Sequence, residues 1–88
     1  MTLRINVCGK VQGVAFRYSA QHYANKLDIK GYAKNLPNGS VEIIAQGSEE
    51  NIQSFVVWCH KGPSRAKVEN VEWDEIDEKI MLTNFHVR

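Results

Sequence analysis

An α+β sandwich is the fold class that this sequence of 88 residues predicts, on three observations. Residues 3–8 alternate between apolar and polar side chains, which indicates a strand with one buried face. Residues 16–27 and 48–61 carry apolar side chains at the helical period instead. The Pro-Asn-Gly turn at 37–39 favours a hairpin, because proline fixes φ and Asn-Gly tolerates positive φ.

The first helix follows the first strand through a loop that contains glycine. Its apolar residues recur at intervals of three and four, so they share one stripe. They are Phe16, Ala20, Tyr23, Ala24 and Leu27. We expect this helix to end near Asp28, because Gly31 follows. A short strand is then predicted over residues 32–36.

The return strand of the hairpin is predicted over residues 40–46. Ser48, followed by two glutamates, is typical of a helix start. Apolar residues from Ile52 to Cys59 give this second helix its buried stripe. Lys61-Gly62-Pro63 ends it, because a cation suits the negative end of a helix and glycine and proline stop it.

Two more strands complete the chain, over residues 66–76 and 84–88. Val68 and Val71 cannot share one face of the first of these strands without an extra residue. We therefore predict a β-bulge near Glu69–Asn70. The acidic residues between 69 and 78 are expected to form a solvated face of this strand and its turn.

The element order is βαββαβ with a trailing strand. This order predicts a ferredoxin-like sandwich, with an antiparallel sheet, two helices on one face and a single domain over 1–88. A right-handed crossover makes the first two strands parallel, with the third between them. The loop at 9–14 and Asn35 then share one rim of the sheet, on strands about 10 Å apart.

Composition excludes several classes of protein. The net charge of +1 argues against a protein that binds polyanions through bulk electrostatics.

No signal peptide and no apolar run of membrane-spanning length are evident, so cytoplasm is the expected location. Cys8 and Cys59 have no metal-ligand spacing and are expected on opposite faces of the sheet, which predicts two free thiols. None of the three histidines sits at metal-ligand spacing with a carboxylate, so we expect no metal.

The stretch from Gly9 to Arg17 has the residues of an anion site. Glycines allow positive φ, so main-chain N–H groups can converge on one point. The start of the following helix adds unpaired N–H donors and a partial positive charge, and Arg17 adds a fork that grips two phosphate oxygens. The candidate main-chain donors are Gly9, Lys10, Val11, Gln12, Gly13 and Val14. An ordinary strand-to-helix loop with a solvated arginine would show the same spacing.

Asn35 is of interest because of the shared rim. Its amide oxygen can accept a hydrogen bond from water while its NH₂ group donates to a neighbour. An aspartate there would repel a phosphate. The residue type therefore suits the positioning of water beside an anion, although a strand-end asparagine often only bonds its own backbone.

Two motifs together resemble the signatures of the acylphosphatase family. Residues 7–17 read Val-Cys-Gly-Lys-Val-Gln-Gly-Val-Ala-Phe-Arg and are similar to the first signature. Residues 31–35, Gly-Tyr-Ala-Lys-Asn, with 39–41, Gly-Ser-Val, and Gly47, resemble the second. The motifs cover the first half of the chain, and the second half is similar in element order alone.

The resemblance implies an enzyme that hydrolyses carboxyl-phosphate anhydrides to a carboxylate and inorganic phosphate, without metal or cofactor. It implies that Arg17 binds the phosphate, that Asn35 orients the attacking water, and that residues 9–14 supply N–H donors. A small acyl phosphate is the implied substrate, and phosphate or a similar anion is the product or inhibitor. A monomer is expected, with no nucleic acid and no membrane as partner.

Two alternatives remain at this point. The fold is shared by RNA-binding modules of the RRM type, and residues 30–33 begin like their aromatic strand motif. Lys34 and Asn35 then stand where stacking aromatic residues should follow. The other alternative is a catalytically silent domain that senses a phosphate ligand, since binding and turnover would use the same groups.

Overall fold

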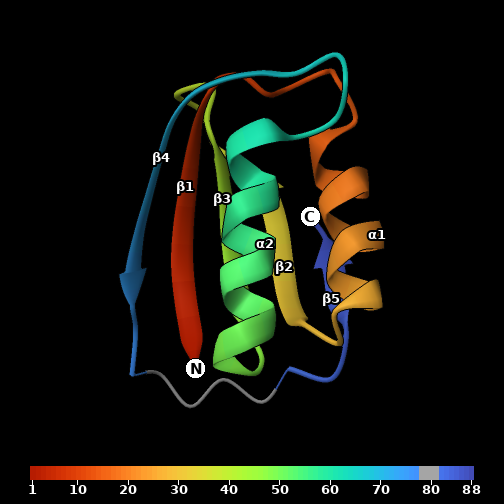
Figure 1. Ribbon diagram of the computed structural model, residues 1–88. Coiled ribbons are helices and arrows are strands. Elements are labelled where there is room, and N and C mark those ends of the chain that lie inside the picture. The colour runs from red at the N-terminus through yellow and green to blue at the C-terminus, as the bar shows by residue number, and fades with distance from the viewer. Residues whose placement is uncertain (78–81) are drawn as a thin grey trace.

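The computed structural model describes residues 1–77 and 82–88, and it has the predicted order of elements (Figure 1). The strands and helices are β1 (Thr2–Lys10), α1 (Phe16–Lys26), β2 (Lys30–Asn35), β3 (Val41–Gln46), α2 (Glu49–Lys61), β4 (Lys67–Glu75) and β5 (Phe85–Val87). Each lies within a few residues of its predicted bounds. The βαββαβ prediction is therefore confirmed.

The strands form one sheet in the order β4-β1-β3-β2-β5. As predicted, β3 lies between β1 and β2 and is antiparallel to both. The last strand differs from the antiparallel expectation, because β5 pairs with β2 in parallel. The sheet is therefore mixed, and β4 and β5 are its edge strands among the described residues.

Both helices cover the same face of the sheet, and the core lies between them and the strands (Figure 1). The largest side chains that are fully buried there include Phe16 of α1 and Phe55 of α2. Burying a side chain of this size stabilises the fold by about 1.5–3 kcal/mol. The Trp58 ring stacks on Tyr23 at a centroid distance of 5.6 Å, which holds α2 against α1.

The predicted bulge is present where β4 pairs with β1. Cys8 pairs with Asn70 and Gly9 with Val68, so Glu69 is the extra residue. Gly9 has a φ of 126°, and a Cβ there would lie 2.2 Å from the main-chain oxygen of Lys67. Glycine is required at this position because the two strands approach so closely.

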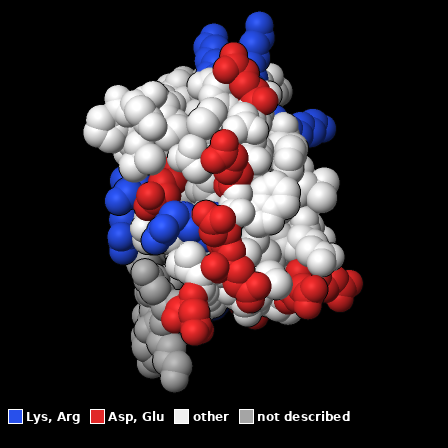
Figure 2. All heavy atoms as spheres, turned by 90° about the vertical axis from the view of Figure 1, so that its left-hand side faces the viewer, with Lys and Arg blue, Asp and Glu red and all other residues white. Residues whose placement is uncertain are grey.

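Acidic side chains gather along β4, as the sequence predicts (Figure 2). The exposed acidic residues of this strand are Glu69, Glu72, Asp74 and Glu75. Asp77, just after the strand, is also exposed. Glu78, the last member of the predicted run, lies outside the described residues.

The cysteines are free thiols, as expected. Cys59 is buried on α2, and burial raises the pKa of its thiol well above the ordinary value. Its side chain therefore packs as a small apolar group and supplies no thiolate nucleophile at neutral pH. In the described part of the chain, no helix has the length and apolar character needed to cross a membrane.

Candidate functional site

The segments that carry the candidate residues meet at one rim of the sheet (Figure 1). Val41, the first residue of β3, pairs with Val7 of β1 on one side and with Asn35 of β2 on the other. Asn35 is therefore level with Val7, and the chain after Val7 runs past the end of β2. The structure thus brings the loop after β1 and the end of β2 together as the topology predicted.

The side chain of Gln12 ties these two segments to each other. Its Nε2 donates to the main-chain oxygen of Leu36 at 2.8 Å and to that of Ser40 at 2.9 Å. These acceptors stand at the two ends of the β2–β3 turn, just beyond Asn35. The loop is therefore held at a set distance from Asn35 by contacts between residues 24 and 28 positions apart.

The turn itself is held by Asn38. Its side-chain oxygen accepts from the main-chain N–H of Ser40 at 3.0 Å and from the Ser40 hydroxyl at 2.6 Å. Ser40 is buried, and its hydroxyl also lies 3.1 Å from the side-chain oxygen of Asn6 on β1. A polar network thus links β1, the turn and the loop beside the rim.

The N-terminus of α1 opens at this rim without a side-chain cap. Its N-cap residue, Ala15, has a φ of 62° and no oxygen to accept a hydrogen bond, and the first turn holds no acidic residue. The first intrahelical bond runs from the N–H of Ser19 to Ala15. The N–H groups before Ser19 therefore have no partner within the helix, and they carry the positive end of its dipole.

Arg17 lies in the first turn of α1 and is half-buried. Its Nη1 donates to the main-chain oxygen of Arg88 at 2.5 Å, and the Arg88 N–H donates to Ala33 of β2 at 2.9 Å. Ala33 precedes Asn35 by two positions, about 7 Å along a strand. Pairing of β5 with β2 therefore brings the Arg17 guanidinium next to the end of β2.

Asn35 is exposed and ends β2. Side chains alternate along a strand, so Asn35 shares the face of Ala33, which is buried toward the helices. The amide is thus on the side of the sheet where α1 begins.

The predicted phosphate-binding residues differ in what the structure leaves available to a ligand. Gly9 and Lys10 belong to β1 and pair with β4, so close strand packing accounts for the glycine at position 9. Val11 and Val14 send their side chains into the core, which leaves only their main chain for binding. Gly13 has a φ of 75°, and a Cβ there would meet nothing within 4 Å. The space beside Gly13 is therefore open to a ligand.

Sequence reasoning missed the structural partners of the site. Gln12 was expected to contribute its main chain, whereas its side chain makes the link to the turn. Ser40 and Arg88 were not singled out as site residues at all. No local pattern could reveal their links to the site, because Ser40 accepts from Gln12 and Arg88 accepts from Arg17, and these partners are distant in the chain.

The described residues, 1–77 and 82–88, bring no three His, Cys, Asp or Glu side chains together in a way that could hold a metal ion.

Tyr32 is the aromatic residue of the strand that resembles an RNA-binding motif. On the open face of the sheet, its hydroxyl donates to Glu42 at 2.9 Å, and the Arg88 guanidinium lies 4.1 Å from the centroid of its ring. Burial, together with this bond, raises the pKa of Tyr32. The aromatic residue that an RNA-binding module would use is thus engaged within the protein.

The arrangement is suited to holding an oxyanion. Main-chain N–H groups, a helix dipole and a guanidinium lie along one rim, and a carboxamide stands at the neighbouring strand end. A neutral amide there can orient a water molecule without repelling the anion.

Comparison with known proteins agrees with this geometry. The family model described as acylphosphatase matches residues 3–87. An acylphosphatase of Geobacter metallireducens is 48% identical over 100% of this chain and 99% of its own length. An acylphosphatase of Anaeromyxobacter dehalogenans is 44% identical over 97% of this chain and 91% of its own. The crystal structure of acylphosphatase from Bacillus subtilis superposes with a TM-score of 0.95, at 38% identity over 99% of this chain and 97% of its own.

Proposed function

The chain belongs to the acylphosphatase family and hydrolyses carboxyl-phosphate anhydrides, and on that premise we propose that the loop after β1, Arg17 and Asn35 perform the reaction. The family membership does not favour the two alternatives, a silent phosphate sensor and an RNA-binding module. The substrate is a small acyl phosphate, and inorganic phosphate is a product.

The phosphate group binds where α1 begins. Main-chain N–H groups of residues 9–14 and of the first helical turn donate to its oxygens, and Arg17 adds a full charge. Arginine has five N–H donors, and Arg88 takes one of them in the structure. A fork that faces two phosphate oxygens stabilises the charge that spreads over the equatorial oxygens in the transition state.

The attacking water is held by Asn35. The amide oxygen accepts from the water and leaves a lone pair on the water oxygen aimed at phosphorus. As the bond from water to phosphorus forms, the bond from phosphorus to the acyl oxygen breaks, and its electron pair leaves with the carboxylate. The proton of the water passes to an oxygen of the phosphate itself.

This reaction needs no general acid, because a carboxylate is a good leaving group without a proton. Positioning and charge stabilisation therefore account for most of the catalysis. We assign no step to a metal or cofactor.

The observation that carries this proposal is the pair of hydrogen bonds from Gln12. They hold the loop beside the β2–β3 turn, so that a phosphate at the loop has Asn35 as its neighbour. Pairing of β1 and β2 with β3 sets the two strands about 10 Å apart but does not fix the loop that follows β1, which Gln12 holds in place.

The proposed site is tested by hydrolysis and by phosphate binding in one protein sample. We expect rapid hydrolysis of benzoyl phosphate and no hydrolysis of phosphoserine, whose alkoxide is a poor leaving group. Inorganic phosphate should inhibit competitively and shift the amide NMR signals of residues 9–18. The signals of residues 48–51, at the start of α2, serve as the control. Competitive inhibition with shifts confined to α2 would show that the phosphate binds elsewhere.

We also propose that residues 1–88 act as a single, monomeric, cytoplasmic unit, with neither nucleic acid nor membrane as partner. The net charge of +1 supports the absence of a nucleic acid partner, because a protein that binds polyanions through bulk electrostatics carries a larger positive charge. Light scattering on a gel-filtration column should give a mass near 10.0 kDa. A mass of twice that value would contradict the monomer.

A further inference from the structure

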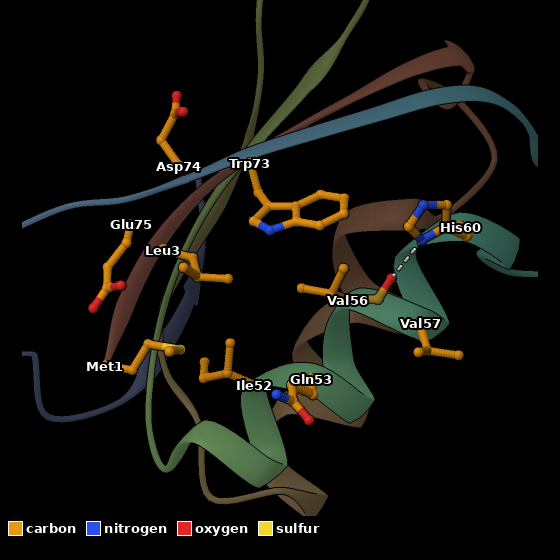
Figure 3. A pocket seen from close by; sticks show the side chains of 10 residues that line it. All are labelled: Met1, Leu3, Ile52, Gln53, Val56, Val57, His60, Trp73, Asp74 and Glu75. Atoms are coloured by element: carbon orange, nitrogen blue, oxygen red, sulfur yellow. Dashed lines mark hydrogen bonds between the residues drawn. The ribbon is translucent and has the colours of Figure 1, made fainter.

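A cavity of about 610 Å³ lies between α2 and the edge strand β4, away from the rim that holds Arg17 and Asn35 (Figure 3). This volume is typical of pockets that bind small molecules. Residues from β1, α2 and β4 line it, and none of them belongs to the proposed catalytic site. The reaction described above therefore gives this cavity no role.

The inner surface of the cavity is apolar. Leu3 and Ile52 are core residues, and Val56 lies across from the indole of Trp73, which projects from β4 into the cavity (Figure 3). Trp73 is 49% exposed, and Val57 beside the cavity is 72% exposed. Large apolar side chains left open to water around a hollow are typical of a binding surface.

Polar groups stand at the ends of this apolar surface. The His60 ring meets Trp73 edge-on at a centroid distance of 6.0 Å, and its Nδ1 lies 3.0 Å from the main-chain oxygen of Val56. At the other end Glu75 follows Trp73 by two positions and lies on the same side of β4, whereas Asp74 points away (Figure 3). The cavity thus has an aromatic wall with a carboxylate near its opening.

The charge around the cavity is negative although the chain as a whole is +1. The lining residues include Asp74 and Glu75 and neither lysine nor arginine. Met1 also belongs to the lining, and its N-terminal ammonium group donates to the main-chain oxygen of Gly47 at 3.1 Å, so the two carboxylates outnumber it. Acidic side chains also line the adjacent β4 surface (Figure 2), and the first turn of α2 adds Glu49 and Glu50. Such a surface raises the local concentration of cations and disfavours anions such as acyl phosphates.

We propose that this cavity binds a small organic cation, an ammonium group carried on an aromatic or aliphatic body. The body fills the space between Trp73 and Val56 and removes their apolar surface from water. The ammonium group pairs with Glu75 and gains from the indole ring, since tryptophan is the aromatic residue that attracts cations most strongly. The occupant is thus distinct in charge from the substrate.

The test compares two probes of nearly the same shape, 4-phenylbutylamine and 4-phenylbutan-1-ol, in NMR titrations of the whole protein at low salt. We expect the amine to shift the signals of Trp73 and of Val56 and to bind at least about fivefold more tightly than the alcohol. The difference should shrink at high salt, because screening weakens exposed charge pairs.

Two variants and a control locate the effect. Glu75→Gln should bring the affinity for the amine close to that for the alcohol, and Trp73→Ala should weaken both by more than about tenfold. Glu72→Gln is the matched control, because it removes an equal charge from the other face of β4. It should leave the preference for the amine intact, and benzoyl phosphate hydrolysis should be unchanged in all three variants.

Three results would overturn the proposal. Equal affinity for the amine and the alcohol would show that the cavity binds apolar groups without recognising the positive charge. No shift in the cavity signals with millimolar amine would show that the cavity takes no small cation. Binding of a lysine-rich peptide, without binding of the amine, would make this face a docking site for a protein.

Discussion

The N-termini of α1 and α2 lie at opposite ends of the sandwich and differ in how their N–H groups are satisfied (Figure 1). At α2, Ser48 accepts a hydrogen bond from the N–H of Asn51 at 3.2 Å, and Glu49 and Glu50 stand in the first turn. At α1, the cap position holds Ala15 in a left-handed conformation, and the first turn contains no acid.

On the proposed function, this difference separates a structural helix end at α2 from an anion-binding one at α1. The α2 end is satisfied by oxygens of the protein, which complement its dipole. The α1 end leaves its donors to an outside acceptor and forgoes about 1 kcal/mol that a cap would contribute. An alanine at φ 62° adds a further backbone cost. Such a combination is reasonable where binding of an anion, rather than stability, is required.

Arg17→Ala should have the largest effect, because it removes the full charge at the α1 end. We expect kcat/KM for benzoyl phosphate to fall by at least about 10²–10³, as for loss of one preorganised donor elsewhere. Arg17→Lys should show most of the same fall in kcat/KM, since the point charge of lysine lacks the planar fork of arginine. Lys26→Ala, at the other end of the same helix, is the control. Near wild-type turnover in either Arg17 variant would remove Arg17 from the mechanism.

Asn35→Ala should have the second largest effect on turnover, because the water loses its orienting group while the phosphate site stays intact. Misplacement of a reacting group by about 1 Å can cost on the order of 10²-fold in rate. We therefore expect kcat to fall by that order, with the inhibition constant of phosphate nearly unchanged. The exposed Asn25→Ala on α1 is the control. A variant that loses phosphate affinity instead would place Asn35 in anion binding.

Gln12→Ala should affect both stability and activity, because it removes the link between the loop and the β2–β3 turn. The main-chain oxygens of Leu36 and Ser40 each lose one hydrogen bond but keep a main-chain N–H donor. At about 0.5–1.5 kcal/mol for each lost bond, the free energy of unfolding should fall by about 1–3 kcal/mol. The kcat/KM should also fall roughly tenfold, because small displacements of the phosphate relative to the water held by Asn35 slow the reaction. Urea unfolding and benzoyl phosphate kinetics measure the two effects, with exposed Gln53→Ala as control. Full activity in a destabilised variant would mean that the link serves folding alone.

Ser48→Ala should have the smallest effect and should separate the two helix ends. Loss of the cap at α2 should cost about 1 kcal/mol of unfolding free energy, while hydrolysis stays unchanged. The same substitution at exposed Ser54, within α2, should cost nothing, because alanine favours helix. A fall in kcat/KM in Ser48→Ala would show that the comparison of the two ends is mistaken.

Much of this fold follows from local patterns. The alternation over 3–8, the stripes of the two helices and the turn at 37–39 predicted the elements from β1 to α2 in order. Even the bulge at Glu69 was predicted, because two apolar stretches out of phase on one strand require an extra residue. The parallel pairing of β5 with β2 was not predictable, since a three-residue strand carries no signal of its partner.

For the site, the sequence by itself determined the residue types and their shared rim: a loop with positive-φ glycines, Arg17 at a helix start and Asn35 at a strand end. These follow from local conformational preferences and from the handedness of the crossover. Only the tertiary structure decided what holds them in place, namely the bonds from Gln12 to the turn and from Arg17 to Arg88. Those partners are 24 to 71 residues apart in the chain, and only packing of the finished sheet brings them within hydrogen-bond distance.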